Sequence, residues 1–134
     1  MRNRFTASWL AACALLAASF SASALVIGDI EVSSRYGERF SARIPLQLQP
    51  GEDIELGCVR IDHIGGADAA VPLLGNYTMK LEPVRDGRSA VLVSTVISLT
   101  EPTVRIGLVI RCGQKISLAR EFIVNQALAD TQKK

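Results

Sequence analysis

Apolar residues recur at every second position through most of this chain, and this period constrains its fold more than any other feature. In the stretch 103–112, Val104, Ile106, Leu108 and Ile110 fall on one side, and Cys112 continues that side. Alternation of this kind is the period of a β-strand with one buried face. Turn-forming residues interrupt the pattern at regular intervals. The sequence therefore predicts an all-β protein built from short strands.

Seven antiparallel strands are expected in the chain. Their ranges are 25–34, 42–48, 54–64, 76–84, 89–99, 103–112 and 116–125. Between the fourth and fifth, Asp86-Gly87 supplies the positive φ values that a tight primed hairpin turn requires. Pro45 cannot donate to a β-ladder, so its strand is expected at a sheet edge or a bulge. Seven strands in about 100 residues predict an immunoglobulin-like β-sandwich, with a small barrel as the alternative.

The first 24 residues resemble a cleaved export signal. A basic Met-Arg-Asn-Arg head precedes an uncharged stretch, 5–20, and Ala22 and Ala24 give the small-x-small pattern of a signal peptidase site. The mature chain is therefore expected to begin near Leu25. One domain, 25–126, should follow, and the tail 127–134 loses the β pattern and is expected to fray.

Two alternatives to cleavage remain open. An uncleaved membrane anchor is disfavoured because the apolar run is rich in Ala and Ser and no second charged flank follows it. The segment Leu-Ala-Ala-Cys13 resembles a lipobox, so lipidation at Cys13 is the other alternative. Cleavage predicts an exported protein with no integral membrane span.

Signal removal also cancels the net charge. The full chain holds 15 basic and 13 acidic residues, and loss of Arg2 and Arg4 leaves 13 of each. A neutral mature chain has no field that would recruit nucleic acid or an anionic membrane.

Removal of the signal leaves two of the three cysteines, Cys58 and Cys112, in an oxidising compartment. A structural disulfide is therefore expected. The alternation is ambiguous around Gly57-Cys58, which predicts a bulge there. A redox or metal site is the alternative, and it is disfavoured because the cysteines form no CxxC motif and only His63 could assist them.

Six segments of the mature chain carry a family resemblance in their order along the sequence. They are Leu25-Val-Ile-Gly-Asp-Ile-Glu-Val-Ser-Ser34, Phe40-Ser-Ala-Arg-Ile-Pro-Leu46, Pro50-Gly-Glu52 with Val59-Arg-Ile61, Leu81-Glu-Pro-Val-Arg-Asp-Gly-Arg88, Val93-Ser-Thr95 with Glu101-Pro102, and Arg120-Glu-Phe-Ile-Val124. Together they resemble the periplasmic N-terminal domain of the FimV/TspA family. Those proteins take part in type IV pilus assembly and cell-pole organisation, and the family offers no catalytic residues to transfer.

The sequence departs from that family in three places. The region 64–75 is shorter and richer in glycine than the family's helical insertion. Arg111-Cys112-Gly113 stands where a Trp-containing turn is expected, and the cysteine pair is not a general family feature. The family's LysM module, transmembrane helix and acidic cytoplasmic part have no counterpart in this sequence.

The residues that could act as catalysts, metal ligands or phosphate-binding loops predict no enzyme, metal site or cofactor. His63 is the only histidine, and the adjacent Asp62 should point to the other face of its strand, away from the imidazole. The acidic residues are scattered without the spacing of a calcium loop. Gly65-Gly66 is too short for a phosphate cradle.

The expected partner is another protein of the cell envelope. The candidate contacts are a sheet edge, including the Pro45 strand if its outward amides are free, or a glycine-rich loop. The loop residues are Gly65, Gly66, Asp68, Leu73 and Gly75. Binding to peptidoglycan or another envelope glycan is an alternative, although the mature chain has few aromatic residues for sugar stacking. An enzyme, or an inhibitor of an envelope hydrolase, is the other alternative.

Overall fold

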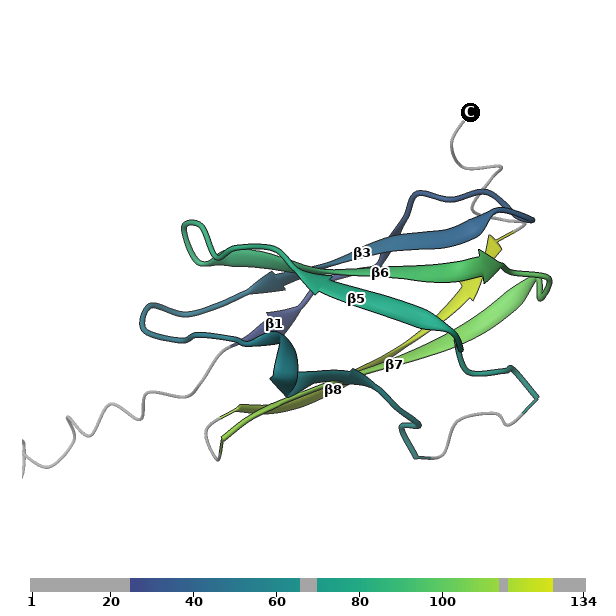
Figure 1. Ribbon diagram of the computed structural model, residues 1–134. Helices are drawn as coiled ribbons and strands as arrows, with labels where there is room; N and C mark the ends of the chain where they lie inside the picture. The colour runs from purple at the N-terminus through teal and green to yellow at the C-terminus, as the bar shows by residue number, and fades with distance from the viewer. Residues whose placement is uncertain (1–24, 66–69, 114–115, 127–134) are drawn as a thin grey trace, which may run out of the picture.

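Two antiparallel sheets face each other in the computed structural model, which describes residues 25–65, 70–113 and 116–126 (Figure 1). The strands are β1 (Val26–Ile27), β2 (Glu31–Val32), β3 (Arg39–Gln47), β4 (Val59–Ile61), β5 (Tyr77–Leu81), β6 (Arg88–Ser98), β7 (Thr103–Cys112) and β8 (Ile116–Asn125). The five-stranded sheet has the order β1-β3-β6-β5, with β2 also paired to β3, and the three-stranded sheet has the order β4-β7-β8. The sheets do not close into a barrel, so the sandwich prediction is confirmed.

Side chains from the two inner faces form one core. Phe40 and Ile44 from β3 and Ile106, Leu108 and Ile110 from β7 are completely buried. The predicted apolar side of β7 is thus confirmed.

The outer face of β7 is also covered, which the alternation did not predict. Arg105 and Val109 are only 5% and 7% exposed. The chain that follows β4 folds over this face, since a Cβ on Gly107 would overlap the carbonyl oxygen of Asp62 and approach the Ile64 side chain to 3.2 Å. The Asp62 N–H also donates to the Gly107 carbonyl at 2.8 Å. Residues 62–64 therefore pack directly on the central strand of the three-stranded sheet.

Of the two alternatives for the Pro45 strand, a sheet edge or a bulge, the edge is wrong, because β3 is flanked by β6 on one side and by β1 and β2 on the other. The irregularity lies instead in the segment that pairs with β3, between β1 and β2. Gly28 donates to the Pro45 carbonyl at 2.8 Å, and the pairing shifts by one residue before β2. Pro45 has no N–H to offer on that side. The expected first strand, 25–34, is therefore divided into two short ones.

The expected third strand, 54–64, is mostly not a strand. A 3₁₀ turn, η1 (Leu56–Cys58), precedes β4, which has only three residues. The Cys58 N–H donates to the Glu55 carbonyl at 3.0 Å, closing this turn. The bulge prediction at Gly57-Cys58 is thus wrong. The turn places the Cys58 side chain beside the end of β7.

The predicted hairpin turn between β5 and β6 is confirmed. Asp86 and Gly87 have φ values of 52° and 71°. Arg85 and Arg88 exchange two backbone hydrogen bonds of 2.9 Å across the turn. Both central residues lie in the left-handed region, as a primed two-residue turn requires.

Cys58 and Cys112 form a disulfide, as predicted, with their Cα atoms 5.1 Å apart. The bond ties η1 to the last residue of β7. Disulfides persist in oxidising, exported compartments and are rare in the cytosol. Among the described residues, no helix has the length and apolar character needed to cross a membrane.

Candidate functional site

The predicted partner-binding loop lies at one end of the sandwich, between β4 and β5. Gly65 is exposed, and Gly66 and Asp68 lie outside the described residues, as do Ala22, Ala24 and Cys13. Leu73 and Gly75 line a groove of about 270 Å³. We call this feature the end groove; its walls are residues 72–76 and 97–101, and Val104 also lines it.

Residues 72–76 form the near wall of the end groove, which is hydrogen-bonded to β7. The Arg105 N–H donates to the Pro72 carbonyl, and the Leu74 N–H donates to the Arg105 carbonyl, both at 2.9 Å. Leu73 thereby forms a parallel bridge with Arg105. The loop that composition alone singled out is thus anchored at its C-terminal end, next to the core.

Residues 97–101 form the far wall, which is held in place by the connection between β2 and β3. The Tyr36 hydroxyl donates to the Thr100 carbonyl at 3.0 Å, and the Leu99 N–H donates to the Glu38 carbonyl at 3.3 Å. Both walls are therefore held by contacts that exist without a ligand. A groove of this kind is preformed, which lowers the entropic cost of binding.

Buried apolar residues underlie the end groove, polar side chains share its lining, and its rim carries an exposed aliphatic residue. Leu74, Leu99 and Val104 are buried, and Ile97 on the rim is 56% exposed. The sequence did not identify Ile97, because its position in the alternating strand matches that of the core residues Val91 and Val93. The pairing of β5 with β6 ends at Thr95, so Ile97 has no neighbour from β5.

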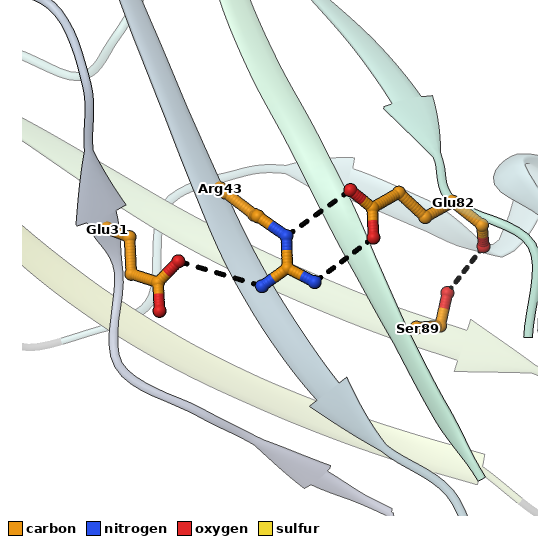
Figure 2. A network of polar contacts seen from close by, with 4 residues as sticks. All are labelled: Glu31, Arg43, Glu82 and Ser89. Atoms are coloured by element: carbon orange, nitrogen blue, oxygen red, sulfur yellow. Dashed lines mark hydrogen bonds and ion pairs between the residues drawn. The ribbon is translucent and has the colours of Figure 1, made fainter. Parts of the chain in front are cut away.

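A second feature is a polar cluster that extends from Arg43, on the outer face of the five-stranded sheet, to the buried Ser89 (Figure 2). The Arg43 guanidinium donates to both carboxylate oxygens of Glu82, at 3.2 and 3.1 Å, and lies 3.6 Å from a Glu31 oxygen. The Ser89 hydroxyl donates to the Glu82 carbonyl at 2.6 Å. We call these four residues the Arg43 cluster. It links β2 and β3 to the residue that follows β5, and its one cation is already paired with carboxylates.

Hydrogen bonding to Arg43 lowers the pKa of Glu82 below its ordinary value of 4.5. The same contact raises the pKa of Arg43. A carboxyl group whose pKa is lower in the folded state stabilises the fold above its unfolded-state pKa and loses that effect as the pH falls. The contribution is small because the pair is open to solvent.

Replacing Glu82 with glutamine is expected to lower the melting temperature slightly at pH 7. The difference from the wild-type protein should shrink as the pH falls below about 4.5, the ordinary pKa of the unfolded-state carboxyl group, and vanish once the folded-state carboxyl group is also protonated. Thermal unfolding followed by circular dichroism between pH 3 and 7 measures this. A difference that stays constant over the whole range contradicts the proposed ion pair.

His63 lies in a setting that differs from a catalytic dyad. Its Nδ1 is 3.1 Å from Nη2 of Arg105. A guanidinium only donates, so Nδ1 accepts and the ring proton is on Nε2. Oδ1 of Asp62 accepts the backbone N–H of His63 at 2.8 Å, and its Oδ2 lies 3.8 Å from Nε of Arg60.

The end groove is the concave feature that joins the predicted loop residues to an apolar interior. Within the described ranges, no three His, Cys, Asp or Glu side chains gather where they could hold a metal ion. The lining of the groove combines apolar side chains with the polar side chains of Asn76, Ser98, Thr100 and Glu101. No family model, curated protein or solved structure matches the chain.

Proposed function

We propose that this protein is an exported β-sandwich that binds another protein of the cell envelope through the end groove. The observation that carries the proposal is the groove itself, a hollow of mixed polar and apolar lining above the buried Leu74 and Val104, with Ile97 exposed at its rim. Protein interfaces obtain most of their binding energy from a few apolar anchors in such well-packed pockets. The groove fits one aliphatic or aromatic side chain of a partner.

A protein fits this surface better than a glycan does. Sugar rings stack on exposed aromatic faces, and the described part of the chain has four aromatic side chains, Tyr36, Phe40, Tyr77 and Phe122. Phe40 and Phe122 are in the core, and Tyr77 is half-buried against it. Tyr36 is the exposed one, and its hydroxyl braces the groove wall.

We also propose that the protein is periplasmic, cleaved after Ala24, and related to the FimV N-terminal domain. The support is the six-segment resemblance, the signal-like N-terminus and the disulfide between Cys58 and Cys112. On this reading, the partner belongs to the machinery of pilus assembly or cell-pole organisation. The protein does no chemistry on it.

Substituting Ile97 with aspartate is expected to reduce capture of the partner from periplasmic extracts by at least about tenfold, because docking would bury an unpaired carboxylate. Val26→Asp is the matched control, since Val26 is 51% exposed and lies at the other end of the sheet. Quantitative mass spectrometry of proteins retained by the tagged chain gives the readout.

Both variants should fold, because both side chains are largely exposed in the wild-type protein. Circular dichroism establishes this before capture is compared. Equal recovery of every retained protein by the wild-type chain and by Ile97→Asp would refute binding at the end groove.

A further inference from the structure

The longest edge strand of the sandwich is β8. It has ten residues and pairs with β7 on one side only. The other described edges are shorter: β1 and β2 have two residues each, β4 has three and β5 has five. Long, regular edge strands present unpaired backbone groups to other chains, and proteins normally shorten, bend or cover them.

The hydrogen-bond phase of β8 shows which of its amides face outward. The Gln126 N–H donates to the Pro102 carbonyl at 2.9 Å, in the same register that pairs Phe122 with Ile106. Even-numbered residues therefore bond to β7, and odd-numbered residues point their N–H and carbonyl groups away from the sheet. The outward amides are those of Ser117, Ala119, Glu121 and Ile123. Within the described part of the chain, none of these four has a partner strand on that side.

The same edge is accessible to another chain. Ala119 and Ile123 are exposed, Ile123 by 61%. No proline interrupts β8. Outward amides at every second residue, about 6.8 Å apart, match the repeat of an added extended segment.

The charges along β8 indicate what kind of segment fits. Arg120 on the inner side is neutralised, since it bonds Asp29 and the Ile27 carbonyl and lies 4.9 Å from the Phe122 ring centre. Glu121 on the outer side forms no ion pair with any of the described residues. An added strand therefore meets an uncompensated carboxylate on its outer face, where a basic side chain directly opposite is favourable.

We infer that β8 accepts an extended segment of a partner protein as a fourth strand of the three-stranded sheet, with basic residues on its outer face and apolar residues on its inner face. The inference rests on the proposed function in one respect, that the partner is a protein. It uses a different surface from the end groove.

A ten-residue synthetic peptide of alternating valine and lysine tests this with the exported protein. At a peptide concentration about ten times its Kd, amide hydrogen exchange measured by NMR should slow by about tenfold at Ser117, Ala119, Glu121 and Ile123. The outward amides of the β5 edge, at Tyr77, Met79 and Leu81, should be unaffected and serve as the internal control. A peptide of alternating valine and glutamate should bind at least about fivefold more weakly.

N-methylation supplies the decisive control. Methylating the peptide nitrogens that face β8 should abolish binding, and methylating the alternate set should not. Failure of the valine-lysine peptide to bind at millimolar concentration, equal protection at β5, or equal binding of both methylated peptides would overturn the inference. None of these results affects partner capture through Ile97, which is measured separately.

Discussion

Replacing both Cys58 and Cys112 with alanine lowers the free energy of unfolding by about 4 kcal/mol, on our account. The disulfide joins residues 54 apart in sequence, and the open chain regains the conformational freedom that the bond removed. A loss of this size is a large share of the roughly 5–15 kcal/mol that stabilises an ordinary domain. Urea denaturation followed by circular dichroism measures it.

Reduction supplies the control for this prediction. Dithiothreitol should destabilise the wild-type protein by a similar amount and leave the double alanine variant unchanged. Thiol titration of the unfolded wild-type protein should find no free thiol among its mature cysteines. Two free thiols, or equal stability of the oxidised and double alanine proteins, would contradict the role given to the bond.

Substituting Gly107 with alanine is expected to cost about 2–3 kcal/mol. The added methyl group would overlap the Asp62 carbonyl oxygen, which is backbone and cannot rotate away. Relief requires residues 62–64 to move off β7, and this movement would break the hydrogen bond from the Asp62 N–H to Gly107. Urea denaturation again provides the measurement.

Gly65→Ala is the matched control for Gly107→Ala. A Cβ at Gly65 meets no atom within 4 Å. The free energy of unfolding of Gly65→Ala should therefore stay within about 0.5 kcal/mol of the wild-type value. If the two variants were equally stable, the packing of residues 62–64 on β7 would be incorrect. Because the same segment leads to the near wall of the end groove, Gly107→Ala should also reduce partner capture.

The parts of the fold that could be predicted are those in which local pattern and final structure agree. The ranges of β7 and β8 match the expected strands 103–112 and 116–125 because turn signals bound both segments and the apolar alternation is clear in 103–112. The Asp86-Gly87 turn followed from residue type alone. The Cys58–Cys112 pair followed from the count of cysteines that remain after the signal.

The parts that could not be predicted depend on contacts between distant segments. Residues 54–64 have apolar side chains at strand spacing, yet η1 replaces most of the strand where Cys58 meets Cys112. Pro45 is compatible with an interior strand because the facing chain is interrupted at Gly28. Neither the position of β4 nor the break opposite Pro45 is encoded in a local period.

The sequence predicted one wall of the candidate site and not the other. Glycine content indicated the loop that contains Leu73 and Gly75, but nothing in the pattern placed residues 97–101 opposite it. Ile97 has the parity of a core residue, yet it is exposed beyond Thr95, where the pairing of β6 with β5 ends and the register of β6 with β3 shifts. Likewise, the pairing of Arg43 with Glu82 depends on the strand order of the sheet.

Photo-crosslinking in living cells tests the central claim, partner binding at the end groove, most directly. The photoreactive residue p-benzoylphenylalanine is placed at Ile97 in one strain and at Val26, which is similarly exposed, in another. On our account, illumination yields an adduct with a second envelope polypeptide from the Ile97 position and none from Val26. Absence of an adduct at Ile97, or an equal yield of the same adduct at Val26, in cells that export the oxidised protein would contradict the account.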